Sequence, residues 1–311
     1  MKKRRKMLIV LSSLTAIVAA VAIYFAAGNA KYRHKIDDLL CAEGTPQVNA
    51  PVEKKLLSFH GSEIHYFVSG NRDGQAIVFL HPAFGDHACF DPQIDFFAPS
   101  YFVITIDMAG HGLTGSQGGK ISETPEHVAA ILEAEKIDAA HIAGVSLGSL
   151  LAQDFSLKYP DKTLSVCALG GYDINREQPL VARAQRREMG KWLFRMIFSM
   201  DAFRRYTASV TVCDEAQQAR FYLSARHFTR GSFRSMSGLD ELIANRPGAG
   251  EGIPLFILVG ENDNDLAKTA AAQWHDDRPD SDFHIIPGAG HCANMDNPVL
   301  FNELLLNFIN K

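Results

Sequence analysis

Short apolar runs recur along the chain and are typical of buried strands. Six of them are nearly continuous rather than alternating with polar residues: Ala76–Leu80, Tyr101–Ile106, His141–Val145, Leu164–Leu169, Ile253–Val259 and Asp282–Ile286. Runs of this kind suit parallel strands that are covered on both faces. Two earlier runs, Leu56–His60 and Glu63–Val68, flank Gly61-Ser62 and predict an antiparallel hairpin.

Segments with helical periodicity lie between these runs. Three of the predicted helices are one that begins at Thr124-Pro125, one from Leu147 that ends before Pro160, and one that begins at Asn297-Pro298. In each of them apolar residues recur every three or four positions, and proline marks a start or an end. Strands that alternate with helices in this way predict a doubly wound α/β sheet.

The alternation is interrupted over residues 172–250. This stretch has helical patterns and no convincing strand; in one pattern, apolar residues from Leu180 to Ile197 face one way and arginines face another. We expect a helical insertion that covers the sheet as a cap. The predicted core is then formed by residues 55–171 and 251–311.

The N-terminal segment has a different pattern. A basic cluster, Lys2–Lys6, precedes 21 residues without charge, Met7–Ala27. That length is sufficient for a spanning helix and exceeds the usual apolar part of a secretory signal. Residues 1–30 are therefore predicted to be a membrane anchor, or alternatively a cleaved signal of a secreted protein, and residues 31–54 a linker. The excess of Lys and Arg before the apolar run predicts a single-pass protein with its folded domain outside the cytoplasm.

Composition narrows the classes of partner. The chain is 47% hydrophobic and 21% charged, as expected for a globular protein with a large core. Its net charge of −4 gives no argument for binding nucleic acid, so none is expected as a partner. The five cysteines are widely spaced without a C-x-x-C pair, which disfavours a zinc site. Disulfide pairing and oligomeric state stay open.

The strongest chemical signal is the pentapeptide Gly144-Val145-Ser146-Leu147-Gly148. It follows a predicted strand and opens a predicted helix, which is the context of a nucleophile elbow. A serine in so tight a turn has a strained backbone, and side chains at the two glycine positions would clash. Alone, G-x-S-x-G is compatible with an ordinary turn serine. In this context we predict that Ser146 is a nucleophile.

A serine hydroxyl needs a base to react. His291 ends the segment Gly288-Ala289-Gly290-His291 and follows the last predicted strand. A supporting carboxylate is expected after the preceding strand, where Asp263 lies 28 residues before His291. Glu261 and Asp265 are alternatives, and without a catalytic role this acidic cluster is simply a solvated loop.

The order Ser146, Asp263, His291 is similar to that of the α/β-hydrolase superfamily, in particular its capped branch of esterases, lipases and C–C-bond hydrolases. The resemblance covers about residues 56–311. Two more motifs carry it: Asp107-Met108-Ala109-Gly110-His111-Gly112 resembles the D-x-x-G-x-G loop, and His81-Pro82-Ala83-Phe84-Gly85 resembles the H-G-x-x-G loop. It implies an α/β-hydrolase fold, with a mostly parallel eight-stranded sheet, flanking helices and a helical cap. It also implies a structural role for Asp107.

The resemblance further implies an oxyanion hole, in which one donor comes from the H-G-x-x-G loop. This chain departs from that pattern because Pro82 replaces the glycine, and proline has no N–H to donate. By position, the expected donors are the backbone N–H groups of Ala83 and Leu147, with Phe84 as the alternative to Ala83. His81 is expected to orient the loop, and a second catalytic histidine is the alternative.

These residues predict a serine hydrolase that cleaves a carboxylic ester, such as a small lipid or a lactone, through an acyl-enzyme. No metal or organic cofactor is required, and the expected partner is a small-molecule acyl substrate. Two alternatives stay open: C–C or amide hydrolysis with the same triad, and a membrane-tethered binding protein without activity. Epoxide hydrolases and haloalkane dehalogenases of this fold have aspartate where Ser146 stands, so both of those reactions are disfavoured.

Overall fold

A computed structural model of the protein describes residues 18–28, 30, 48–246 and 248–311. Within them, eight strands form one sheet in the order β1-β2-β4-β3-β5-β6-β7-β8. β1 (Val52–Phe59) and β2 (Ser62–Gly70) form an antiparallel hairpin. The remaining strands are β3 (Ala76–Leu80), β4 (Phe102–Ile106), β5 (Ala140–Val145), β6 (Thr163–Leu169), β7 (Leu255–Gly260) and β8 (Asp282–Ile286). β2 pairs with β4 antiparallel, and β3 to β8 run parallel, which confirms the predicted sheet.

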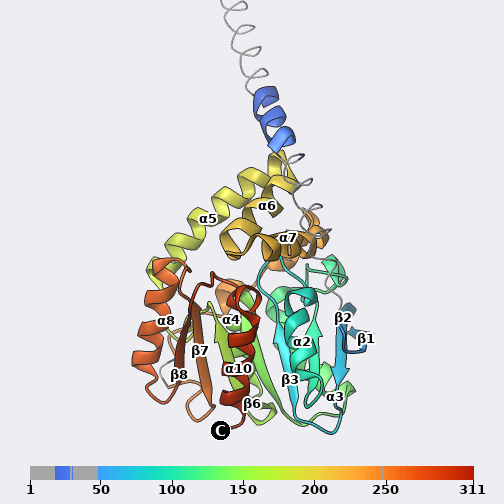
Figure 1. Ribbon diagram of the computed structural model, residues 1–311, viewed down its shortest axis with the longest axis vertical. Coiled ribbons are helices and arrows are strands. Elements are labelled where there is room, and N and C mark those ends of the chain that lie inside the picture. Colours follow the sequence, from blue (N-terminus) through green and yellow to red (C-terminus); the bar gives the residue numbers. More distant parts are fainter. Residues whose placement is uncertain (1–17, 29, 31–47, 247) are drawn as a thin grey trace, which may run out of the picture.

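Helices cover both faces of the sheet (Figure 1). They are α2 (Asp91–Phe97), α3 (Thr124–Ala134), α4 (Leu147–Lys158), α8 (Asp265–Asp277), α9 (Ala293–Asp296) and α10 (Pro298–Ile309). Every residue of β3 is buried, because alternate side chains enter two different cores. Val78 and Leu80 pack in the core under α3, α4 and α8, whereas Ile77 and Phe79 pack in the core under α2 and α10. Burial on both faces explains the nearly continuous apolar runs.

A helical insertion separates β6 from β7, and we use this name for residues 172–250. It contains α5 (Pro179–Phe198), α6 (Met200–Thr211), α7 (Glu215–Ser224) and the short 3₁₀ helices η5 (Ala225–His227), η6 (Gly231–Met236) and η7 (Leu239–Glu241). Figure 1 shows α5, α6 and α7 lying across one end of the sheet. Among the described residues, this part of the chain contributes no strand to the sheet.

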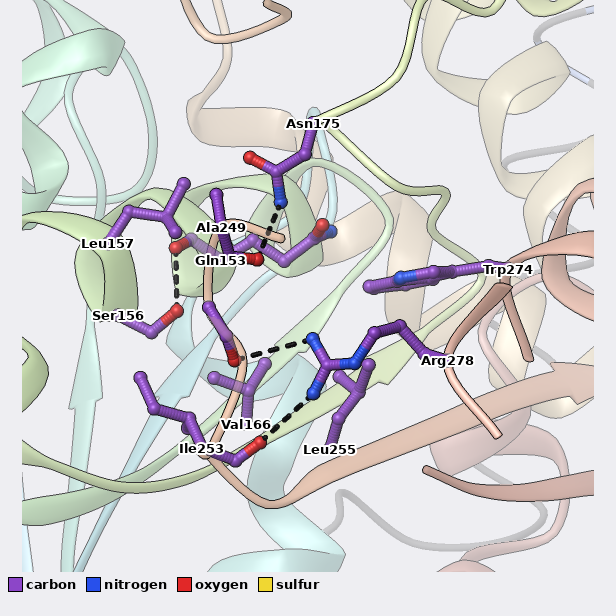
Figure 2. Close-up of a pocket in the computed structure, with 11 residues that line it drawn as sticks. Gln153, Ser156, Leu157, Val166, Asn175, Ala249, Ile253, Leu255, Trp274 and Arg278 are labelled. Atoms are coloured by element: carbon purple, nitrogen blue, oxygen red, sulfur yellow. Dashed lines mark hydrogen bonds between the residues drawn. The ribbon is translucent and has the colours of Figure 1, made fainter. Parts of the chain in front are cut away.

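Hydrogen bonds close the base of the insertion, where it leaves and re-enters the core. Asn175 Nδ2 donates to the carbonyl of Ala249 (3.5 Å), and the guanidinium of Arg278 donates to the carbonyls of Gly250 and Ile253 (Figure 2). These residues border a cavity of about 30 Å³. That volume holds a water molecule or two, so this cavity is too small to be a substrate site.

The predicted membrane anchor is wrong. Of the predicted span Met7–Ala27, residues 7–17 lie outside the described residues, and residues 18–28 are helical. In the part of the chain that the structure describes, no helix is long and apolar enough to cross a membrane. This finding overturns the predicted single-pass, extracytoplasmic placement and the predicted membrane contact.

The predicted linker, residues 31–54, is described only at its end. Residues 31–47 lie outside the described residues. β1 begins at Val52 and so includes the last three residues assigned to the linker. The sheet therefore begins earlier in the chain than the apolar pattern indicated, because an edge strand needs few apolar residues and most of β1 is exposed.

Candidate active site

Ser146 lies on a sharp turn between β5 and α4. Its backbone has φ 54° and ψ −114°, a positive φ that is uncommon for a residue other than glycine. A Cβ atom on Gly144 would lie 2.1 Å from the carbonyl oxygen of Gly148, and one on Gly148 would lie 2.0 Å from that of Leu80. Neither contact is possible, so the turn requires glycine at both positions.

Asp263 and His291 meet at the edge of the sheet that is formed by β7 and β8. His291 Nδ1 lies 2.7 Å from Asp263 Oδ2, and the Asp263 side chain is only 3% exposed. The two residues are 28 apart in sequence, but the loops after two adjacent parallel strands bring them together. Of the two alternative acids, Glu261 accepts the backbone N–H of Gly288, and the Asp265 side chain is 99% exposed.

The Asp263 carboxylate determines the tautomer of His291. An ionised carboxylate can only accept a hydrogen bond, so Nδ1 carries the proton and Nε2 keeps its lone pair. Burial lowers the pKa of His291, but the charge of Asp263 and its hydrogen bond outweigh burial and raise this pKa above its ordinary value. The ring is therefore oriented and made more basic by the same contact.

Ser146 and His291 both border the end of β6. The backbone N–H of Ser146 donates to the carbonyl of Leu169 (2.7 Å), and a Cβ on Gly170 would lie 3.0 Å from His291 Cε1. Among the described residues, no hydrogen bond joins the Ser146 hydroxyl to His291. Such bonds are often long without substrate and shorten when the reacting complex forms.

His81 fixes the loop that follows β3. The ring is fully buried, its Nδ1 donates to the carbonyl of Pro82 (2.9 Å), and its Nε2 accepts the backbone N–H of Met108 (3.0 Å). Burial lowers the pKa of His81, which keeps the ring neutral. Because both ring nitrogens are engaged, the geometry favours the predicted orienting role over that of a second base.

Free backbone N–H groups occur where an oxyanion hole was predicted. Among the described residues, no acceptor is bonded to the backbone N–H of Ala83, Phe84 or Leu147. Leu147 is the first residue of α4, whose first N–H groups have no partner within the helix. Phe84 has φ 72°, a strained backbone for a side chain of this size. Both Ala83 and Phe84 therefore stay available as the second donor.

Asp107 has the structural role that the resemblance implied. One carboxylate oxygen accepts the backbone N–H of His87 (2.9 Å) and the other accepts that of Leu113 (2.7 Å). The carboxylate is fully buried, and it fills the space where a side chain on Gly112 would lie. Asp107 thus stabilises the loops after β3 and β4.

A hollow of about 380 Å³ opens beside the Asp263–His291 pair. Its lining combines the loops after β7 and β8 with residues 209–213 of the insertion. The insertion thus borders the site as well as covering the sheet. Two further carboxylates that bind the insertion, Asp86 and Asp296, were not singled out from the sequence. The only signal was their position, just after the H-P-A-F-G loop and five residues after His291.

The family of the chain follows from a comparison with known families. Residues 77–304 match the family described as "Alpha/beta hydrolase family", a span that includes all three predicted triad residues. The chain belongs to the alpha/beta hydrolase family. This alpha/beta hydrolase is an enzyme, which argues against a binding protein without activity.

Relatives of this alpha/beta hydrolase carry out several hydrolytic reactions. It is 24% identical to 2-(acetamidomethylene)succinate hydrolase of Mesorhizobium japonicum, over 76% of this chain and 88% of the relative. It is 25% identical to 3-oxoadipate enol-lactonase 2 of Acinetobacter baylyi, over 80% and 94%. A carboxylesterase structure from Bacillus subtilis has a TM-score of 0.67 at 16% identity, over 90% of this chain and 98% of that chain. At that identity the structural likeness shows the fold alone.

Proposed function

We propose that this alpha/beta hydrolase is a serine hydrolase that cleaves carboxylic esters, including lactones, through an acyl-enzyme. The observation that carries the proposal is the hydrogen bond between the buried carboxylate of Asp263 and His291, beside the strained turn of Ser146. A carboxylate that orients a histidine, next to a serine on a tight strand-to-helix turn, is the arrangement that activates a hydroxyl nucleophile.

The proposed mechanism assigns one role to each group. His291 Nε2 removes the proton of Ser146, whose oxygen attacks the carbonyl carbon of the ester. The N–H groups of Leu147 and Ala83 stabilise the oxyanion, and His291 then protonates the leaving alcohol. In the second half, His291 activates a water molecule that releases the acid and regenerates Ser146. Asp263 keeps the imidazole in the required tautomer throughout.

C–C-bond or amide hydrolysis with the same triad is the alternative. It is favoured by the 24% identity to a 2-hydroxy-6-oxononadienedioate/2-hydroxy-6-oxononatrienedioate hydrolase of Burkholderia vietnamiensis, over 80% of this chain. Esters remain the first choice because the relatives also include an enol-lactonase. These enzymes differ in substrate while sharing the fold, so substrate choice has to be measured.

Labelling and hydrolysis test the proposal together. A fluorophosphonate should label the wild-type protein at Ser146, located by peptide mass spectrometry, and should not label Ser146→Ala. A panel of p-nitrophenyl esters and lactones of graded chain length should be hydrolysed by the same protein. Label on another residue, or a folded protein that is inert toward the whole panel, would contradict ester hydrolysis at Ser146. Cleavage of a vinylogous 1,5-diketone without ester cleavage would favour the C–C alternative.

A further inference from the structure

Asp296, the last residue of α9, joins the loop that carries His291 to the insertion. Its Oδ2 accepts the backbone N–H of Gly290 (2.8 Å), the residue directly before His291. Its Oδ1 accepts the backbone N–H groups of Cys213 (3.0 Å) and Asp214 (2.9 Å), which lie between α6 and α7. A single carboxylate thus holds two segments that belong to different parts of the fold.

The same part of the insertion, between α6 and α7, also binds the residue that follows His291. The backbone N–H of Cys292 donates to the carbonyl of Thr211 (2.9 Å). A Cβ on Gly290 would lie 2.8 Å from the Cys213 sulfur, so the two segments approach as closely as glycine allows. The residues that flank His291 are therefore both fixed against the insertion, and the histidine loop has little freedom to move on its own.

Asp86 makes an equivalent connection at the other end of the proposed site. It directly follows the H-P-A-F-G loop and is 2% exposed. Its carboxylate accepts the Ser224 hydroxyl and His227 Nδ1 (3.1 Å) from the insertion, and the backbone N–H of Ala88 (3.1 Å) from the core. It lies close along the chain to Ala83, a proposed oxyanion donor. A buried carboxylate with these partners is costly to displace, because each donor would lose its acceptor.

Phe84 adds an apolar contact to this connection. Its ring packs edge to face on Trp192, Phe203 and Phe228 of the insertion, with ring centroids 4.9 to 5.0 Å apart. The loop that follows β3 is thus held by the insertion on both sides of Gly85, through Phe84 before it and Asp86 after it. Aromatic pairs in this geometry contribute about 0.5–1.5 kcal/mol each beyond their buried area.

We propose that Asp86 and Asp296 are positioning residues that hold the two loops of the proposed active site against the insertion. The inference rests on the proposed function, since it assigns no new reaction. The insertion then does more than cover the substrate, because the His291 loop and the oxyanion loop depend on it for their placement. Catalysis is sensitive to such placement, since a shift of about 1 Å in a reacting group can cost on the order of 100-fold in rate.

The test replaces each carboxylate with an amide of the same shape. Asp296→Asn turns one acceptor oxygen into an NH₂ group that faces a backbone N–H donor. Asp86→Asn removes the negative charge that binds the Ser224 hydroxyl and His227 Nδ1. We expect kcat for a p-nitrophenyl ester to fall on the order of 10- to 100-fold, with KM within about threefold of wild type. Ser224→Ala removes a donor from the insertion side and should lower kcat in the same direction. Amide hydrogen exchange at residues 211–214 and 288–292 should become faster in Asp296→Asn.

Asp95→Asn is the matched control. Asp95 also accepts two backbone N–H groups of a distant segment, those of Asn49 (2.7 Å) and Ala50 (2.9 Å), but it lies on α2 and contacts neither loop. Its variant should keep the wild-type kcat. If Asp296→Asn does not fold, Asp296→Glu keeps the charge and displaces it by one methylene, so the same fall in kcat is expected.

Two failures can be told apart. Folded Asp86→Asn and Asp296→Asn variants with wild-type kcat and unchanged exchange overturn the positioning roles while leaving the proposed function intact. A wild-type protein that neither hydrolyses esters nor accepts fluorophosphonate overturns the proposed function and the catalytic part of the inference with it. In that case, faster exchange in Asp296→Asn still supports the structural connection between the insertion and the His291 loop.

Discussion

Asp263→Asn gives the sharpest test of the proposed triad. Asp263 Oδ1 accepts both the backbone N–H and the side-chain NH₂ of Asn264 (2.7 and 2.9 Å), and Oδ2 accepts the proton of His291 Nδ1 (2.7 Å). Both Asn264 groups that contact Oδ1 are donors, so in the variant the amide oxygen must occupy the position of Oδ1. The amide NH₂ then faces His291 and donates to Nδ1. The imidazole is forced into the tautomer that carries its proton on Nε2.

That tautomer cannot remove the proton of Ser146. We expect kcat to fall about 10⁴-fold, which corresponds to about 5 kcal/mol of lost transition-state stabilisation. Stability should change much less, because the amide keeps the volume of the carboxylate and its contacts with Asn264. The pKa of His291 should also fall, since the charge that raises it is removed.

The assay is steady-state hydrolysis of a p-nitrophenyl ester between about pH 5 and 9, a range that brackets the ordinary histidine pKa, with circular dichroism as the check on folding. Asp265→Asn is the control, because this acid is a sequence neighbour whose side chain is 99% exposed. It should keep kcat within about threefold of wild type. Glu261→Gln should lower kcat less than Asp263→Asn does, since Glu261 accepts the backbone N–H of Gly288 but does not bind the His291 ring. The reasoning fails if Asp263→Asn retains more than a tenth of the wild-type kcat, or if Asp265→Asn or Glu261→Gln loses more activity than it does.

Three further predictions follow from the same geometry. Ser146→Ala should lower kcat on the order of 10⁴- to 10⁶-fold with little change in the denaturation midpoint, and activity within about tenfold of wild type would exclude Ser146 as the nucleophile. In the wild type, kcat/KM should decrease as pH falls through the pKa of His291, because protonation removes the base. Asp263 raises this pKa above its ordinary value, so a half-maximal kcat/KM below about pH 6 would contradict that effect of Asp263. Gly148→Ala should lower the free energy of unfolding, measured with denaturant, by about 3 kcal/mol or more, because its Cβ would lie 2.0 Å from the carbonyl oxygen of Leu80. Gly190→Ala on α5 is the control: no atom lies within 4 Å of its added Cβ, so the variant should be as stable as wild type or slightly more stable.

Local patterns identified the fold because strands and helices follow the spacing of apolar residues. β3 and β8 match the predicted runs residue for residue, and α4 and α10 begin where the glycine and proline signals placed them. The turn at Ser146 was also local, since its two glycines and its strained serine lie within one pentapeptide. The predicted membrane anchor was wrong; it rested on the length of the apolar run and on the Lys and Arg residues before it, and not on any contact within the fold.

What the sequence determined by itself was therefore the order of strands and helices, the elbow at Ser146, and Asp263 and His291 as the expected partners of the serine. Only the tertiary structure decided which atoms meet. It selected Asp263 over Glu261 and Asp265, because the carboxylate that reaches His291 depends on how the loops after β7 and β8 bend. It also revealed Asp86 and Asp296. Their partners in the insertion lie 82 to 141 residues away along the chain, and a carboxylate that bonds across such a distance leaves no periodic pattern for a sequence to display.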